Sequence, residues 1–192
     1  MLILASQSPR RRDLLTMLGL DFTIITADID ETMDPALSVE DAVADVCRRK
    51  AAAVGADHPD DLILAADTIV VVDGRVLGKP RDAAHAKEML RLLSGRTHLV
   101  LTAFCLWQKG DCQTHVEQSE IRFKPLSDGE IDAYVATGSP LDKAGAYGIQ
   151  EQAAVFVEAI TGDYYNVMGL PLCAVVKGLR RRGVTVLGTV QP

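Results

Sequence analysis

The sequence predicts an α/β protein built on a mixed sheet that helices flank. Residues 2–5 form a short apolar run, and apolar residues at helical spacing follow it, which is typical of a βα unit. Residues 62–72 are almost continuously aliphatic, as in a strand buried on both faces. Turn signals at Asp73-Gly74 and at residues 109–111 predict antiparallel hairpins, and hairpins combined with βα units give a mixed sheet.

Length and composition bound the kind of protein. With 192 residues, 48% of them hydrophobic, the chain can bury a proper core. We expect a single domain over residues 1–192, undivided or with two lobes. Apolar runs are too short to cross a bilayer, so we expect no membrane contact. A net charge of −6 argues against broad nucleic-acid binding. The oligomeric state is not fixed by the sequence, which leaves a homodimer open.

The cysteines bear on the redox compartment. They form neither a CxxC pair nor a zinc-type spacing with histidine, so we expect reduced, mostly buried thiols. The cytoplasmic location that we expect rests on a separate observation: the N-terminal apolar run is too short for a secretion signal, and its basic residues follow rather than precede it. The four cysteines are Cys47, Cys105, Cys112 and Cys173.

The first βα turn carries an unusual charge pattern. Ser6 and Ser8 precede Pro9, which suits the first position of a helix that Ser8 would cap and Gly19 would end. Residues 10–12 are three arginines at the positive end of the helix dipole, where anions are usually preferred. Backbone donors, hydroxyls and guanidinium groups at one turn would suit a phosphate chain. The alternative is that the arginines extend into solvent.

Caps and turns delimit the elements that follow. Ser38 and Ser127 are placed as N-caps, each with an acidic residue three positions on, and Asp82 is a third cap. Residues 142–150 are small yet charged, as in loops that contact ligands. The expected elements are strand 22–25, helix 39–54, strands 62–72 and 75–77, helix 83–93, strands 99–107 and 114–123, helix 128–135, strand 154–160, a loop at 162–166, helix 171–179 and an edge strand at 184–187.

Asp67 is the clearest single candidate for chemistry. A carboxylate inside a buried strand must lie at a strand end, pair with a cation or bind a metal, because an unpartnered buried charge is costly. Lys79 follows Gly78, so it could place a positive charge on phosphate. Arg48, Arg49 and Lys50 sit late in a helix, where a solvated face is the plain alternative to ligand contact.

With these segments in view, the chain resembles the Maf family of nucleoside triphosphate pyrophosphatases. The matching stretches cover nearly the whole chain in the family's order. They are Ala5-Ser6-Gln7-Ser8-Pro9-Arg10-Arg11, Ala66-Asp67-Thr68-Ile69-Val70, Leu77-Gly78-Lys79-Pro80, Leu93-Ser94-Gly95-Arg96-Thr97-His98, residues 140–150 and residues 162–171. The chain departs at residues 151–154, Glu-Gln-Ala-Ala, where the family usually has a glycine-richer turn.

The resemblance implies a fold, an activity and a set of site residues. The fold is a mixed sheet with helices, in two lobes around a central cleft, similar to inosine triphosphatase. The activity is hydrolysis of a nucleoside triphosphate to the monophosphate and pyrophosphate with a divalent cation, Mg²⁺ or Mn²⁺. By motif, Asp67 matches the catalytic acidic residue, and Arg10, Thr68 and Gln150 match the trio of the subgroup that acts on dTTP and UTP. Positions matching the surroundings of phosphate and metal are Ser6, Arg11, Glu31, Lys50 and Lys79.

The chemistry of cleavage between the α- and β-phosphates fits these residues. Arg11, Lys50 and Lys79 would neutralise the triphosphate, and Asp67 and Glu31 are the credible metal ligands because hard cations take oxygen donors. Asp67 could also orient or deprotonate the attacking water, so base, ligand or both stay open. A second hypothesis is a nucleotide-sensing regulator of cell division that acts by binding alone.

Overall fold

The structure is a computed structural model of the chain, and it describes residues 1–189. A seven-stranded sheet has the strand order β2-β1-β3-β5-β6-β7, and β4 pairs with β3. β1 runs parallel to β2 and β3, whereas the β3–β4 and β6–β7 pairs are antiparallel, so the predicted mixed sheet is confirmed. The strands are β1 (Leu2–Ala5), β2 (Thr23–Ile24), β3 (Leu62–Val72), β4 (Arg75–Leu77), β5 (Thr97–Gln108), β6 (Asp111–Phe123) and β7 (Val157–Thr161).

The helices begin largely where the sequence places their caps. The side chains of Ser38 and Asp82 each accept a hydrogen bond from a backbone N–H at the start of a helix. Ser127 and Glu130 form the expected reciprocal capping box. The α-helices are α1 (Pro9–Met17), α2 (Val39–Asp57), α3 (Ala83–Leu93), α4 (Asp128–Ala136), α5 (Tyr164–Met168) and α6 (Leu172–Arg181), and the 3₁₀ helices are η1 (Ser139–Asp142), η2 (Ala144–Ala146) and η3 (Gln152–Phe156).

The chain divides into two compact units. Unit 1 contains residues 1–67, 102–117 and the chain from residue 169 on, and unit 2 contains residues 68–101 and 118–168. The boundary falls inside β3, β5 and β6, so each of these strands contributes to both units.

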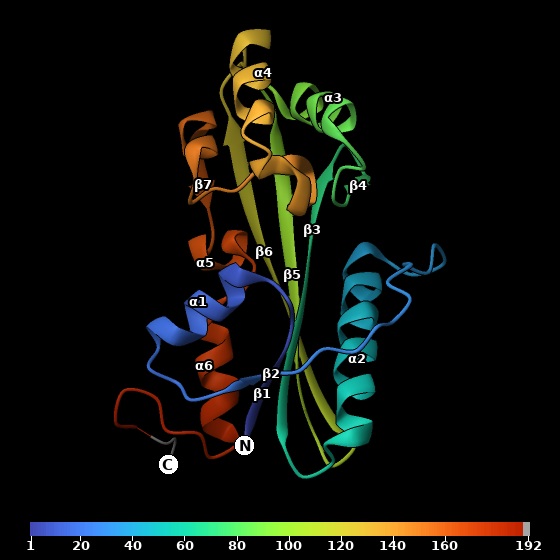
Figure 1. Cartoon of the computed structure of the whole chain (residues 1–192), viewed down its shortest axis with the longest axis vertical. Helices are drawn as coiled ribbons and strands as arrows, with labels where there is room; N and C mark the ends of the chain where they lie inside the picture. Colours follow the sequence, from blue (N-terminus) through green and yellow to red (C-terminus); the bar gives the residue numbers. More distant parts are fainter. Residues whose placement is uncertain (190–192) are drawn as a thin grey trace. The chain divides into compact units, whose positions relative to one another are not determined.

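In unit 1 the sheet carries helices on both faces. A Cβ added to Gly55 of α2 would lie 2.4 Å from the ring of Trp107, and one added to Gly178 of α6 would lie 2.6 Å from Leu106. Consecutive strand residues point to opposite faces, so α2 and α6 cover opposite sides of β5. Figure 1 shows α1 on the same side as α6, with α2 across the sheet. Both glycines allow this close contact between helix and strand.

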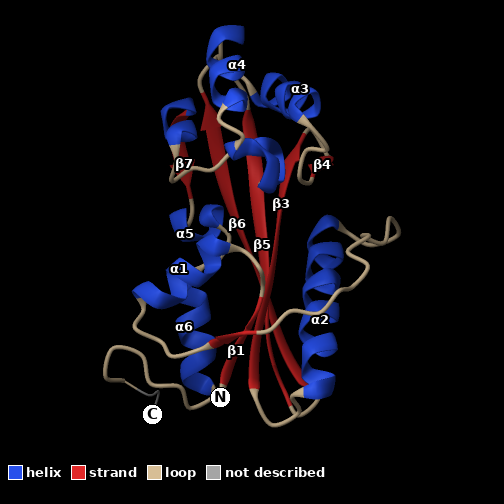
Figure 2. Cartoon of the chain, viewed as in Figure 1, coloured by secondary structure: helices blue, strands red, loops and turns tan. Residues whose placement is uncertain are grey.

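Unit 2 has its own hydrophobic core. Side chains of β3, β5 and β6 meet those of α3 and α4. The two helices also contact one another and lie side by side in Figure 2. Three aromatic residues, Phe123, Tyr134 and Phe156, pack edge to face within this core. The core therefore fixes the strands and helices from which the loops of unit 2 extend.

The described part of the chain differs from expectation in three segments. The predicted loop at 162–166 contains helix α5, because Asp163 accepts a hydrogen bond from the Tyr165 N–H and starts a helical turn. The predicted strand 154–160 begins as η3 and becomes extended only at Val157. The predicted edge strand 184–187 is wrong, since Val186 pairs only with Thr189 across a tight turn.

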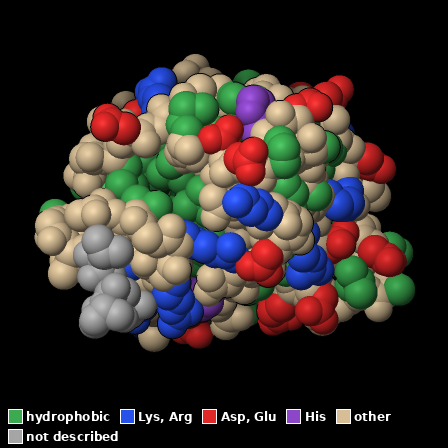
Figure 3. Space-filling view, turned by 90° about the horizontal axis from the view of Figure 1, so that it is seen from below, with side chains coloured by type: hydrophobic (Ala, Val, Ile, Leu, Met, Phe, Trp, Pro, Cys, Tyr) green, Lys and Arg blue, Asp and Glu red, His purple; other side chains and the backbone are tan. Residues whose placement is uncertain are grey.

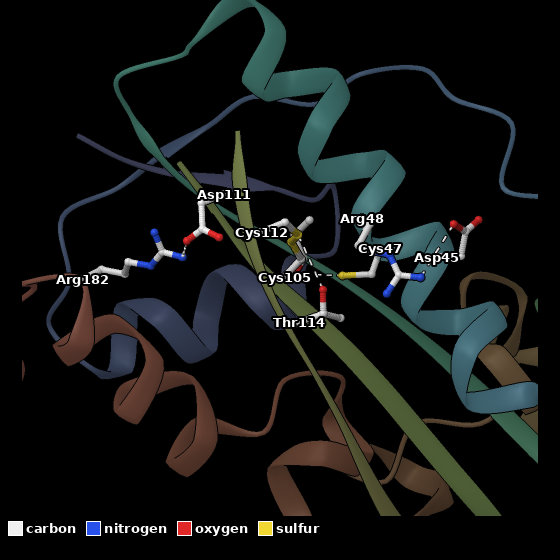
Figure 4. Close-up of a disulfide and its surroundings, with 9 residues drawn as sticks. Asp45, Cys47, Arg48, Cys105, Asp111, Cys112, Thr114 and Arg182 are labelled. Atoms are coloured by element: carbon white, nitrogen blue, oxygen red, sulfur yellow. Dashed lines mark hydrogen bonds and ion pairs between the residues drawn. A yellow bond between two sulfur atoms is a disulfide. The ribbon is translucent and has the colours of Figure 1, made fainter. Parts of the chain in front are cut away.

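The prediction that all the thiols are reduced is also wrong. The hairpin of β5 and β6 brings the Cα atoms of Cys105 and Cys112 to 6.3 Å, and a disulfide joins them (Figure 4). Cys47 of α2 lies beside Cys105, and burial raises the pKa of its thiol to about 12. Cys173 is free and exposed. The hairpin, rather than any cysteine spacing motif, creates the pair.

No helix in residues 1–189 is long and apolar enough to cross a membrane. On the face seen in Figure 3, acidic and basic side chains are interspersed.

Candidate functional site

The turn after β1 separates the three arginines into different environments. Arg11 is buried: its Nε donates to the carbonyl of Gly169 at 2.8 Å, and its Nη1 donates to Ser6 Oγ at 3.1 Å. Arg12 is exposed and pairs with Asp13. Arg10 is half-buried. Solvent extension therefore describes Arg12, whereas Arg11 is fixed under the turn with Ser6.

The helix start itself follows the prediction only in part. Ser8 occupies the N-cap position in an extended conformation and Pro9 follows it, but the Ser8 side chain makes no capping hydrogen bond. Its backbone carbonyl accepts from the Arg12 N–H, and its own N–H donates to Ser6 Oγ at 3.3 Å. Ser6 is thus the residue that joins the turn to Arg11.

Lys50 of α2 holds two carboxylates. Its Nζ lies 2.7 Å from Asp67 Oδ1 and 3.0 Å from Glu31 Oε2. Cys47 lies one turn earlier on α2 and is fully buried. Because residues three apart are neighbours on a helix surface, Lys50 lies at the edge of the buried side of α2. The side chains of Lys50 and Asp67 are only 15% and 16% exposed. Asp67 is therefore paired with a cation, and it does not lie at a strand end because β3 continues beyond it.

Arg11 belongs to the same electrostatic cluster. Burial lowers the pKa of its guanidinium, and the carboxylates of Asp67 and Glu31 act against that shift. Unit 1 therefore brings together five of the residues expected around phosphate and metal. They are Ser6, Arg11, Glu31, Lys50 and Asp67.

The two carboxylates suit a divalent cation that the substrate also binds. Mg²⁺ in phosphate-handling sites is usually held by one or two carboxylates together with substrate phosphates and water. Glu31 and Asp67 offer such a pair of hard oxygen donors, since both reach one ammonium group. Among residues 1–189, no group of three or more His, Cys, Asp or Glu side chains is arranged to hold a metal ion. Glu31 and Asp67 alone would fit Mg²⁺ or Mn²⁺ as two oxygen donors, with bound phosphates and water completing the coordination.

In unit 2, two loops expected to contact the substrate are joined. The Gly145 N–H donates to the Gly78 carbonyl at 3.1 Å, and Gly78 precedes the exposed Lys79. Gly145 has a φ of +69°, and a Cβ there would lie 2.8 Å from Val70, so only glycine allows this approach to β3. The loop that ends at Gln150 is therefore fixed against both β3 and the Lys79 loop.

Thr68, Gln150 and Arg10 are distributed over both units. Thr68 lies on β3 directly after Asp67 and is half-buried, as is Gln150. Both belong to unit 2, whereas Arg10 belongs to unit 1. Their assignment to base recognition remains a prediction from the family's motif.

Sequence reasoning missed Lys143 as an organising residue. Its side chain is 6% exposed, and its Nζ donates to the Ser139 carbonyl at 2.7 Å and pairs with Asp142 and Glu151 at 2.8 and 3.1 Å. The Ser139 hydroxyl also donates to Glu151. Glu151 lies where the chain departs from the family's glycine-richer turn, so here a carboxylate closes the loop next to Gln150. The only feature of the sequence that pointed to Lys143 was a lysine placed among the small residues of the segment 142–150.

Comparison with known proteins extends over most of the chain. A family model described as Maf-like protein matches residues 1–182. A protein named dTTP/UTP pyrophosphatase from Halalkalibacterium halodurans is 50% identical over 182 residues, 95% of this chain and 96% of the relative. Another of that name from Bacillus cytotoxicus is 48% identical over 179 residues, 93% of this chain and 94% of the relative.

Solved structures extend the likeness to the fold alone. The Ham1 protein of Staphylococcus aureus has a TM-score of 0.51 and 15% identity, covering 92% of this chain and 98% of its own. A HAM1 protein from Coxiella burnetii has a TM-score of 0.52 and 19% identity, covering 94% and 98%.

Proposed function

Because the chain belongs to the Maf-like protein family, we propose that it hydrolyses dTTP and UTP to the nucleoside monophosphate and pyrophosphate. One observation carries the chemistry: the Lys50 ammonium group lies between the carboxylates of Asp67 and Glu31. The substrates are supported by relatives at 46–50% identity that are named dTTP/UTP pyrophosphatase. Since these relatives are named as enzymes, a function by binding alone is not favoured.

The cationic residues account for binding of the triphosphate. Lys50 and Arg11 supply positive charge in unit 1, and by the family's motif Lys79 is assigned to the phosphates as well. Such fixed cations stabilise the charge that develops on a leaving pyrophosphate. No GxxxxGK[ST] motif occurs in the sequence, which argues against a P-loop enzyme that removes the γ-phosphate.

Asp67 is the residue assigned to the attacking water. Its pairing with Lys50 fixes the carboxylate, so one oxygen can accept a hydrogen bond from a water aimed at the α-phosphorus. As the new P–O bond forms, the bond to the bridging oxygen breaks and pyrophosphate leaves with the electron pair. Asp67 accepts the proton of the water in this step.

Glu31 and Asp67 are the residues that would hold Mg²⁺ or Mn²⁺. When bound, the cation would neutralise phosphate charge and lower the pKa of a bound water.

We place the activity in the cytoplasm, where nucleoside triphosphates are abundant.

A substrate panel tests this proposal. Purified protein with Mg²⁺ or Mn²⁺ is given dTTP, UTP, CTP, ATP, GTP and 7-methyl-GTP, and pyrophosphate release is measured as kcat/KM. We expect UTP and dTTP to be preferred, because Arg10, Thr68 and Gln150 act together on the base. Comparable values for ATP or GTP would contradict the assignment, as would a preference for 7-methyl-GTP.

A further inference from the structure

We propose that Arg49 is a positioning residue for Glu31, holding the backbone on both sides of it so that its carboxylate stays at Lys50. The inference rests on the proposed function, in which Glu31 lines the phosphate and metal site. It concerns a residue that the family's site motifs leave out and that the charge pattern alone would place on a solvated face.

The guanidinium group of Arg49 bridges the two residues that flank Glu31. Its Nη2 donates to the Thr32 carbonyl at 2.8 Å, and its Nη1 donates to the Asp30 carbonyl. Its Nε donates at 2.8 Å to Asp45, one turn earlier on the same helix. All three bonds come from one planar guanidinium group. The bond to Asp45 therefore sets the plane in which the other two nitrogens reach the carbonyl oxygens of Asp30 and Thr32.

Glu31 needs such a restraint. It lies in residues 25–34, which form neither helix nor strand, and its side chain is 57% exposed. An exposed ion pair is worth little by itself, because holding two long side chains in place costs entropy. The 3.0 Å contact with Lys50 is therefore a weak way to fix the carboxylate. The bonds from Arg49 fix the backbone instead, and they start from the residue next to Lys50 on α2.

A local turn reinforces the same two residues. Asp30 Oδ1 accepts a hydrogen bond from the Thr32 N–H at 2.8 Å, which closes a tight turn around Glu31. The backbone around Glu31 is thus closed on itself by Asp30 and attached to the helix by Arg49. Together the two restraints hold the backbone from which the Glu31 side chain extends.

The preceding arginine provides a matched control. Arg48 extends toward Asp45 (Figure 4). The two side chains approach only to 3.8 Å, and the Arg48 side chain is 44% exposed. Within residues 1–189, Arg48 makes no hydrogen bond or ion pair with the segment 25–34. Arg48→Met removes the same charge and the same length of side chain from the same helix turn, and leaves the bridge intact.

The test compares Arg49→Met with Arg48→Met in UTP hydrolysis. We expect R49M to lower kcat/KM about 10-fold, mainly through kcat, because removing groups that orient site ligands typically costs 10–100-fold. R48M should stay within about twofold of wild type. R49K retains one of the two carbonyl bonds and should fall between them. Melting curves confirm that each variant is folded, and R49K carries the comparison if R49M does not fold.

A double-mutant cycle decides whether Arg49 acts through Glu31. In an E31Q background, the bonds from Arg49 to the Asp30 and Thr32 carbonyls position a side chain that no longer carries charge. Adding R49M should therefore lower kcat/KM by less than about twofold. The same 10-fold loss in both backgrounds would overturn the inference, as would R49M behaving like R48M.

A binding measurement gives a readout without turnover. Mn²⁺ alone is titrated into each protein and followed by electron paramagnetic resonance. We expect R49M and E31Q to weaken Mn²⁺ binding and R48M to leave it unchanged. Weaker binding in E31Q but not in R49M would contradict the inference. If wild-type protein releases no pyrophosphate from UTP, the proposed function fails, and the Mn²⁺ titration then decides the role of Arg49.

Discussion

Replacing Asp67 with asparagine separates the chemistry of this residue from its place in the fold. Asparagine keeps the size but removes the charge that orients the water. Breaking a fully buried ion pair costs about 3–5 kcal/mol and an exposed one about 0–1 kcal/mol. Asp67 is 16% exposed and Lys50 retains Glu31 at 3.0 Å, so we expect an intermediate cost of about 1–2 kcal/mol.

That cost is too small to explain a large loss of turnover. A domain with about 5–15 kcal/mol of stability stays more than about 99% folded after losing 2 kcal/mol. Loss of a general base lowers turnover by about 10² or more, which is about 2.7 kcal/mol in the barrier. The melting temperature should fall by only about 2–8 °C. The catalytic effect and the stability effect can therefore be distinguished.

The assay is pyrophosphate release from UTP by D67N, with melting followed in the same buffer. Asp60→Asn serves as the control, because Asp60 is 89% exposed and 3.9 Å from its partner. D60N should match wild type in both measurements. Folded D67N protein with near wild-type release would refute the catalytic assignment.

Two further predictions concern stability. Burial lowers the pKa of His98 to about 4 from 6.5, so the unfolded chain binds the proton first and stability falls as the pH drops from about 6.5 to about 4, by about 3 kcal/mol in total. Unfolding of H98Q at pH 7 and pH 4.5 should depend less on pH than wild type, and an equal dependence would remove His98 from this role. Reducing the Cys105–Cys112 disulfide, which links residues seven positions apart, should cost at most about 2.5 kcal/mol and lower the melting temperature by several degrees. A melting temperature unchanged by dithiothreitol, in protein shown to be oxidised beforehand, would contradict this.

Elements with local signals could be predicted from the sequence. The capping box of Ser127 and Glu130 and the aliphatic run of β3 depend on neighbours within a few residues, and both occur as expected. The sequence also singled out Asp67, because a charge within an aliphatic run demands a partner. It could not choose Lys50 as that partner, since the pair depends on how α2 packs on β3.

Features that depend on distant contacts were beyond the sequence. Helix α5 looked like a loop because Gly162 and Asp163 are turn residues, yet Ser119 and Asp163 exchange hydrogen bonds that anchor its start. The disulfide follows from the β5–β6 hairpin rather than from a motif. Arg49 looked like a surface charge, since nothing local reveals that the chain near Glu31 passes beside it.

The position of bond cleavage tests the central claim most directly. UTP is hydrolysed in ¹⁸O-labelled water, and both products are analysed by mass spectrometry. Attack at the α-phosphorus places the label in UMP and leaves pyrophosphate unlabelled. Label in pyrophosphate would mean attack at the β-phosphorus, and UDP with inorganic phosphate as the first products would contradict the account altogether.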